Sequence, residues 1–161
     1  MLIPTPVVQL YEADTALDET PREGETPERY VVRVAEAKAR HVAAHAPHRT
    51  VLAADTTVVV DDTILGKPLD ATDAARMLRL LSGRAHQVAT GVSLVVGQEV
   101  VSRVEVTTVE FAPLGADEIA WYVETREPFD KAGAYAIQGR GSRFVVRIEG
   151  SYSNVVGLPV A

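Results

Sequence analysis

The feature that most constrains the fold is the stretch VLAADTTVVVDDTILGKP, at residues 51–68. Its first half is a largely apolar run bounded by turn residues, which predicts a strand buried in a sheet. Asp61-Asp62 predicts a tight turn, and the stretch that follows predicts a short return strand ending at Gly66-Lys67-Pro68. Asp55 lies inside the apolar run, where an ionised carboxylate is costly to bury unless it is paired or binds a cation. Asp55 is therefore either a destabilising residue that the fold tolerates or a group that the strand holds at the edge of a cleft.

The rest of the chain alternates helices with strands and hairpins. Thr26-Pro27-Glu28 combines a hydroxyl N-cap, a proline at the first helical position and an acid, and predicts a helix to about residue 44. The other expected elements are helices over 72–81 and 115–125, strands over 6–13, 86–96 and 100–111, and a glycine-rich loop and strand over 129–141. This order predicts an α/β or α+β fold, with a mixed sheet and flanking helices in a single domain spanning residues 1–161.

Composition narrows the classes of function. The net charge is −6 with no block of lysine and arginine, which argues against a non-specific nucleic-acid or anionic-membrane binder. The absence of cysteine excludes disulfides and thiolate catalysis and suits a reducing compartment. No stretch has the apolar length of a membrane helix, and the first residues lack a basic region followed by a long apolar one. We therefore expect a cytoplasmic location, with no nucleic-acid or membrane partner.

Lys38 stands out on the first expected helix. At 100° per residue, Val31, Val34, Ala35 and Val42 share one apolar stripe, and Lys38 falls in its middle. Such a lysine usually extends its ammonium group to a nearby edge of the protein. The alternative is that the helix aims the ammonium into a pocket.

The unusual residues together favour chemistry on phosphates. They are the buried acid Asp55, the acidic loop pair Asp18-Glu19, Lys38, Lys67 in a Gly-Lys-Pro turn, and Asp130-Lys131 ahead of a loop that contains Gln138. Carboxylates can hold a divalent cation and accept a proton from water, and lysines neutralise phosphate oxygens. Neither a serine–histidine–aspartate order nor a cysteine nucleophile is evident, and the usual dinucleotide and P-loop fingerprints are missing.

Five stretches, in order along the chain, resemble the Maf family of nucleoside triphosphate pyrophosphatases. They are LDETPREGETPERYVVRVAEAKA, VLAADTTVVVDDTILGKP, LSGRAHQVATGVSLV, EPFDKAGAYAIQG and IEGSYSNVVGLP. The resemblance implies a two-lobed fold like that of inosine triphosphate pyrophosphatases, with a central cleft, and usually a homodimer. It also implies hydrolysis of a nucleoside triphosphate to the monophosphate and pyrophosphate with a divalent cation, Mg²⁺ or Mn²⁺.

The resemblance also assigns roles to matching residues. Asp55, in the Ala-Asp-Thr match, corresponds to the proton acceptor, and Glu19, in the Asp-Glu-Thr match, to an acid on the metal side, so Glu19 and Asp55 are the expected metal ligands. Lys38 and Lys67 correspond to phosphate contacts. Thr56 and Gln138 match positions associated with substrate choice, and this chain carries the residues of the subgroup that acts on dTTP and UTP.

The sequence also leaves alternatives. The family pattern includes an N-terminal strand with a Ser-x-Ser-Pro-Arg-Arg loop and a helix after Gly-Leu-Pro, and neither has a match here. Arginines of that kind would be expected to hold phosphates. One alternative is therefore a catalytically impaired protein that binds nucleotides or has a regulatory role. A 7-methyl-GTP pyrophosphatase is a second alternative, disfavoured by Thr56 and Gln138. A structural domain in which Asp55 only pairs with Lys38 or Lys67 is a third.

Overall fold

The structure, a computed structural model, describes residues 17–46 and 48–160. The helices are α1 (Pro27–His45), α2 (Ala71–Leu81), α3 (Ala116–Glu124) and α4 (Tyr152–Val156). The strands are β1 (Val51–Val60), β2 (Thr63–Leu65), β3 (Ala85–Val96), β4 (Glu99–Phe111) and β5 (Val145–Glu149). Short 3₁₀ turns over Glu127–Asp130, Ala132–Ala134 and Arg140–Phe144 connect α3 to β5. The expected strand over 6–13 lies outside the described residues.

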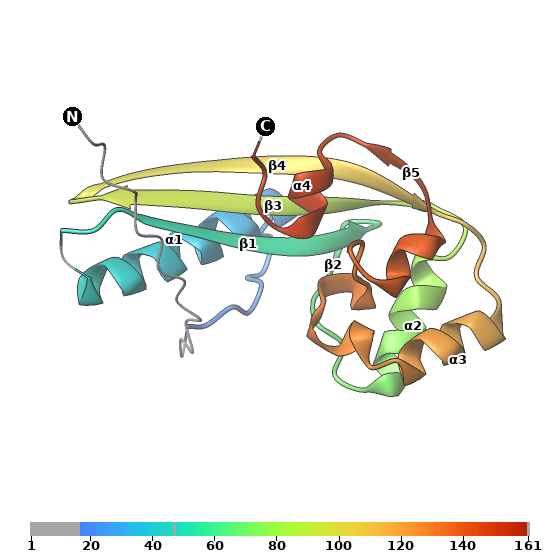
Figure 1. The fold of residues 1–161 in the computed structure, drawn as a ribbon. Helices are drawn as coiled ribbons and strands as arrows, with labels where there is room; N and C mark the ends of the chain where they lie inside the picture. The colour runs from blue at the N-terminus through green and yellow to red at the C-terminus, as the bar shows by residue number, and fades with distance from the viewer. Residues whose placement is uncertain (1–16, 47, 161) are drawn as a thin grey trace, which may run out of the picture.

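The described strands form one sheet in the order β2-β1-β3-β4-β5 (Figure 1). Every neighbouring pair is antiparallel, so the expectation of a mixed sheet is corrected for this part of the chain. The tight turns after Val60 and Val96 impose antiparallel pairing, since parallel neighbours need a long crossover. The strand expected within 129–141 is also wrong: this segment forms 3₁₀ turns, because Gly133 (φ 67°) and Ala134 (φ 60°) leave the extended region.

Helix α1 packs along one face of the sheet, against β1 and β3. Its buried residues are Val31, Val34, Ala35 and Ala39, so Ala39 takes the place that the stripe had given to Val42. The approach to β3 is close at Gly91, where a Cβ atom would lie 2.4 Å from the Val31 carbonyl oxygen. Glycine is needed there because any side chain would push the helix away from the sheet.

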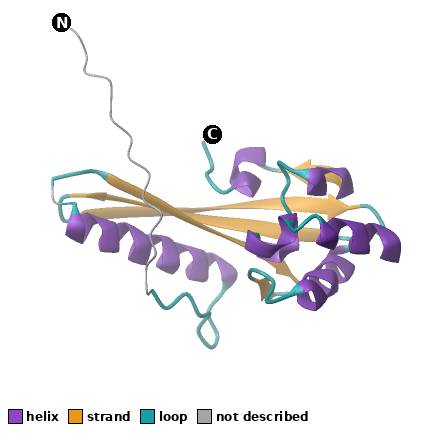
Figure 2. Cartoon of the chain, turned by 60° about the horizontal axis from the view of Figure 1, so that its bottom comes forward, coloured by secondary structure: helices purple, strands orange, loops and turns teal. Residues whose placement is uncertain are grey.

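Helix α4 lies on the opposite face of the sheet (Figure 2). Its residue Asn154 is fully buried, and its side-chain amide donates to the Val88 carbonyl and to Thr107 Oγ1. The antiparallel register places Val88 beside Thr107 on this face. Asn154 therefore fixes the C-terminal helix to the two central long strands.

Among the described residues, the buried apolar side chains form two clusters. The larger one joins α2, α3 and the 3₁₀ turns to the end of the sheet near β2, and it includes Leu78, Phe111, Tyr122 and Phe144. The smaller one lies under α1 near the other end of the sheet and is formed by Ala39, Val51 and Val95. Strand β1 runs through both clusters, so its middle residues lie between them.

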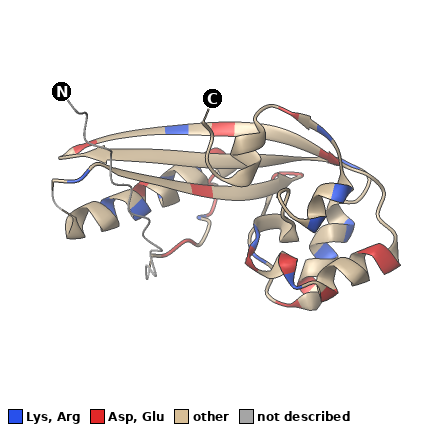
Figure 3. Cartoon of the chain, viewed as in Figure 1, with Lys and Arg blue, Asp and Glu red and all other residues tan. Residues whose placement is uncertain are grey.

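Charges are distributed over both ends of the molecule. Figure 3 shows acidic and basic segments interspersed on α1 and on the helices at the other end of the sheet. None of the described helices has the length and apolar character needed to cross a membrane.

Candidate active site

A pocket of about 460 Å³ opens at the free edge of β1. Strand β2 pairs only with Val58–Val60, so among the described strands the edge of β1 before Val58 has no partner on that side. Residues Ala54 to Val58 line the pocket there. The same pocket is lined by the six residues to which the family resemblance gives roles: Glu19, Lys38, Asp55, Thr56, Lys67 and Gln138. Asp130 and Lys131 line it too, whereas Asp18 is not one of its lining residues.

Lys38 joins the two acids. Its Nζ lies 2.6 Å from Asp55 Oδ1 and 2.9 Å from Glu19 Oε1. The Asp55 side chain is 10% exposed, whereas that of Glu19 is 45% exposed. Of the two interpretations of Lys38, the structure therefore favours the pocket: the helix directs the ammonium at a buried carboxylate. Asp55 lies at a cleft edge and is also paired.

Burial and hydrogen bonding have opposite effects on the pKa values of Asp55 and Lys38. Burial raises the pKa of Asp55 above its ordinary value, although the hydrogen bond from Lys38 lowers it, and the nearby Glu19 carboxylate adds to the rise. Burial acts to lower the pKa of Lys38, but its hydrogen bonds to Asp55 and Glu19 outweigh this and hold that pKa above its ordinary value. The result is a fixed cation beside a carboxylate that binds a proton more readily than a solvated aspartate does.

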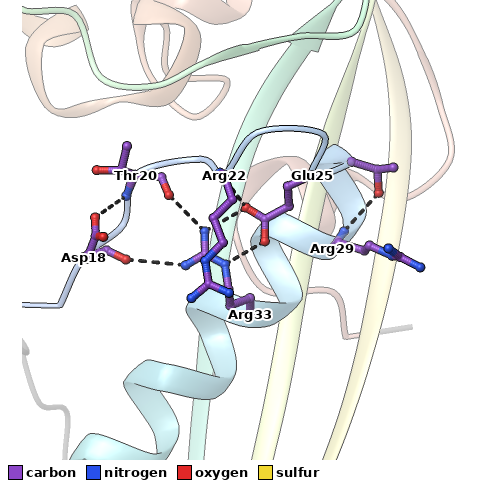
Figure 4. Close-up of polar contacts among 7 residues, drawn as sticks. Asp18, Thr20, Arg22, Glu25, Arg29 and Arg33 are labelled. Carbon is purple, nitrogen blue, oxygen red and sulfur yellow. Dashed lines mark hydrogen bonds and ion pairs between the residues drawn. The ribbon is translucent and has the colours of Figure 1, made fainter.

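The loop that carries Glu19 is held against α1 by Arg33 (Figure 4). The Arg33 guanidinium donates to both carboxylate oxygens of Glu25, at 2.6 and 2.8 Å, and to the carbonyl of Thr20 at 3.1 Å. These hydrogen bonds lower the pKa of Glu25 to about 2, so this carboxylate stays ionised. Sequence reasoning missed this pair, because nothing in the local pattern links two residues on either side of a helix cap.

The other end of the pocket is formed by the loop that carries Gln138. Tyr122 donates to Glu127 Oε1 at 2.7 Å, and the same carboxylate accepts from the backbone N–H groups of Arg140 and Gly141 at 3.0 Å. Tyr122 Oη also accepts from the backbone of Ala136 at 3.0 Å. The loop is thus held on both sides of Gln138, and this bracing could not be found from sequence spacing.

Lys67 reaches the pocket from the turn after β2. The backbone N–H of Gly133 donates to the Gly66 carbonyl at 3.1 Å and ties this turn to the loop opposite. The Lys67 charge acts to lower the pKa values of both Asp55 and Asp130. Lys67 therefore places a second cation within electrostatic range of Asp55, on a different segment from α1.

The profile of the family described as "Maf-like protein" matches residues 5–161. The chain belongs to the Maf family. A dTTP/UTP pyrophosphatase of Symbiobacterium thermophilum is 53% identical over 144 residues, which cover 89% of this chain and 74% of the relative. A dTTP/UTP pyrophosphatase of Anaeromyxobacter dehalogenans strain 2CP-C is 56% identical over 154 residues, or 92% of this chain and 76% of the relative. A dTTP/UTP pyrophosphatase of Shewanella denitrificans is 48% identical over 155 residues, which cover 94% of this chain and 78% of the relative.

The carboxylate oxygens in this Maf pocket are the type of ligand that a divalent cation such as Mg²⁺ prefers. Glu19 and Asp55 direct carboxylate oxygens at one point, the Lys38 ammonium. The described residues hold no cluster of three or more acidic, histidine or cysteine side chains that could form a complete cage. Mg²⁺ is commonly held by one or two carboxylates together with substrate phosphates, so two carboxylates at the wall of this pocket fit that mode.

Tyr30 is a further pocket residue of this Maf protein that sequence reasoning did not single out. It lies two helical turns before Lys38 on α1, and the Arg33 guanidinium lies 5.6 Å from the centre of its ring. Burial raises the pKa of the Tyr30 hydroxyl, and the Asp55 carboxylate adds to the rise. The spacing of eight residues from Lys38 is the signal that could have placed both on one helix face.

Proposed function

We propose that this protein hydrolyses dTTP and UTP to the nucleoside monophosphate and pyrophosphate. The observation that carries the proposal is the convergence of two acids, two lysines and two polar residues in one pocket at the free edge of β1. The names of the Maf relatives support the same substrates.

The arrangement supports a different role for each of these residues in the reaction. Asp55 is the proton acceptor for a water that attacks the α-phosphorus, since its raised pKa makes it a better base than a solvated aspartate. Lys38 and Lys67, which line the pocket together with Asp55, neutralise the phosphate oxygens. Thr56 and Gln138 contact the pyrimidine.

A divalent cation, Mg²⁺ or Mn²⁺, belongs to the proposal. Glu19 and Asp55 would hold it together with the phosphates of the substrate. The cation would supply charge neutralisation at the phosphates. In the absence of substrate, Lys38 screens the two carboxylates from each other. We also propose the two-lobed architecture of the inosine triphosphate pyrophosphatases around this pocket, and a homodimer, on the strength of the family resemblance.

Purified protein incubated with dTTP and Mg²⁺ tests the proposal directly. We expect dTMP and pyrophosphate as products, and Asp55→Asn should lower the rate by about 10²- to 10⁴-fold, the usual contribution of a general base. Asp62→Asn is the matched control, because Asp62 is an exposed aspartate in the turn that ends the same strand. Release of orthophosphate, or full activity in Asp55→Asn, would exclude this mechanism. Nucleotide binding without turnover would favour the impaired, nucleotide-binding alternative.

A further inference from the structure

The hydroxyl of Thr56 belongs to a buried chain of hydrogen bonds. Thr56 Oγ1 lies 2.8 Å from Thr90 Oγ1, across the paired strands β1 and β3. Thr90 Oγ1 in turn donates to the backbone carbonyl of Asn154 at 3.0 Å. Thr90 and Asn154 are both fully buried, whereas Thr56 lines the pocket.

Either threonine could donate in the Thr56–Thr90 contact, and the bond from Thr90 to the Asn154 carbonyl decides between them. A threonine hydroxyl has one proton to donate, and a carbonyl oxygen can only accept. Because Thr90 gives its proton to the Asn154 carbonyl, it can only accept at its contact with Thr56. The Thr56 proton is therefore directed into the protein. Toward the pocket, Thr56 presents oxygen lone pairs alone.

The end of the chain is held firmly. The Asn154 side chain donates to the Val88 carbonyl at 3.0 Å and to Thr107 Oγ1 at 2.9 Å, which fixes α4 on the sheet. The backbone N–H of Asn154 donates to the helix-capping Ser151 Oγ. The Asn154 carbonyl also accepts from the backbone N–H of Gly157 at 3.0 Å, so it cannot turn away from Thr90 without breaking hydrogen bonds within α4.

An acceptor at Thr56 discriminates between pyrimidines. Uracil and thymine, joined to the sugar through N1, carry one ring N–H donor, at N3, between two carbonyl acceptors. Cytosine has a bare acceptor nitrogen at N3. Two acceptors that face each other in a desolvated site leave both without a partner, which costs binding free energy. The Gln138 amide can donate and accept, so it can serve a carbonyl beside N3.

We propose that Thr90 is a positioning residue that holds Thr56 as a hydrogen-bond acceptor for the pyrimidine N3–H, and so selects uracil and thymine nucleotides over cytosine nucleotides. This inference rests on the proposed function. Thr90 itself touches no substrate, because it is fully buried behind Thr56.

The test compares kcat/KM for UTP and CTP in the wild type, Thr90→Val, Thr56→Val and the double variant. Thr90→Val removes the acceptor of the Thr56 proton and frees that hydroxyl to turn toward cytosine N3. We expect the ratio of kcat/KM for UTP to that for CTP to fall by about tenfold, through KM more than kcat. Because Thr90 acts through Thr56, the double variant should have the ratio of Thr56→Val alone.

Two controls separate this role from a structural one. Ser93→Ala removes a fully buried hydroxyl from the same strand, one that accepts from Ser102 at 3.0 Å, and it should leave the ratio unchanged. Thr90→Ser keeps the hydroxyl and should keep the ratio. An unchanged ratio in folded Thr90→Val, or additive effects in the double variant, would overturn the inference while leaving the pyrophosphatase proposal intact.

A measurement on the wild type covers the case in which Thr90→Val does not fold. N3-methyl-UTP lacks the N3 donor, and 5-methyl-UTP carries the same extra methyl group elsewhere on the ring. We expect kcat/KM for N3-methyl-UTP to be at least about tenfold below that for 5-methyl-UTP. Equal values would contradict an acceptor at Thr56, and failure to hydrolyse any pyrimidine triphosphate would instead overturn the proposed function.

Discussion

The two lysines of the pocket favour the charged form of Asp55, and its other surroundings oppose it. The Lys38 ammonium 2.6 Å away stabilises the carboxylate, whereas burial and the Glu19 carboxylate favour its protonated form. The balance leaves the pKa of Asp55 above the ordinary value of 3.8. A general base gains efficiency as its pKa approaches the working pH, so the mostly buried position on β1 serves the proposed reaction.

This balance predicts the pH dependence of the activity. The base works when ionised, so kcat/KM should fall on acidification with a midpoint above 3.8, the ordinary aspartate pKa. Lys38→Gln removes the hydrogen bond that lowers the Asp55 pKa, so the acid limb should move to higher pH, besides any loss of rate at the plateau. Initial rates with UTP from pH 4 to 8, at fixed ionic strength, measure both midpoints.

Arg40→Gln provides the matched control for Lys38→Gln. Arg40 is another cation of α1, but it pairs with Glu36 on the exposed side of the helix. Its replacement should leave the midpoint where it is. A midpoint for Lys38→Gln that is unchanged or lower than that of the wild type would contradict the role given to Lys38.

At the scale of elements, the loop over residues 18–25 depends on α1 for its position. Arg33 binds Glu25 and the Thr20 carbonyl, and thereby holds the segment on which Glu19 reaches Lys38. Arg33→Ala should free the loop and leave α1 folded, because the helix keeps its Thr26 cap and its buried face. We expect the Mg²⁺ concentration for half-maximal activity to rise by about 10- to 100-fold, as when a residue that orients a metal ligand is lost.

The loop prediction is checked by Mg²⁺ titration of activity, with circular dichroism to confirm the helix content. Arg40→Ala is the control, since the exposed Arg40–Glu36 pair lies on the same helix and touches no part of the loop. Exposed pairs of this kind contribute little to stability. If Arg33→Ala showed the Mg²⁺ dependence of the wild type, Glu19 would not need this support.

Local signals predicted α1 to α3 and β1 to β4 well, but they predicted neither β5 nor α4 and described the irregular segments poorly. The helix expected from Thr26 to about residue 44 is α1 (Pro27–His45), because cap, proline and periodicity are all encoded within a few residues. The segment over 127–144 could not be predicted in the same way. Its turns follow from Glu127 and Tyr122 bonding to backbone groups 14 residues away, and such contacts leave no periodic pattern.

The candidate site was predictable in part, for a similar reason. Asp55 and Lys38 are each out of place in an apolar pattern, and the resemblance to the Maf family grouped them with Glu19, Lys67, Thr56 and Gln138. The roles of Arg33 and Thr90 depend on tertiary contacts. An arginine on a helix and a threonine in a strand are ordinary residues until the fold shows which groups face them.

At the scale of the whole molecule, the pocket lies along the middle of β1, between the two apolar clusters. Lys38 and Glu19 approach it from the α1 side, and Lys67 and Gln138 approach it from the side of α2 and the 3₁₀ turns. Both sides pack on β1, which carries Asp55 and Thr56 between them. A bound nucleotide would thus add contacts between segments that both pack on the sheet.

Nucleotide should therefore stabilise the whole fold in a metal-dependent way. A dTTP analogue with a non-hydrolysable α,β-imido bridge, present with Mg²⁺ at 100 times its dissociation constant, should add about 2.7 kcal/mol to the free energy of unfolding. For a chain of 161 residues this corresponds to a rise in melting temperature of about 5–10 °C. Because the phosphates and the two carboxylates repel one another without a cation, the rise should shrink when EDTA replaces Mg²⁺. The matching α,β-imido analogue of ATP shows how much of the rise belongs to the triphosphate alone. Equal shifts with Mg²⁺ and with EDTA would show that Glu19 and Asp55 hold no cation when nucleotide binds.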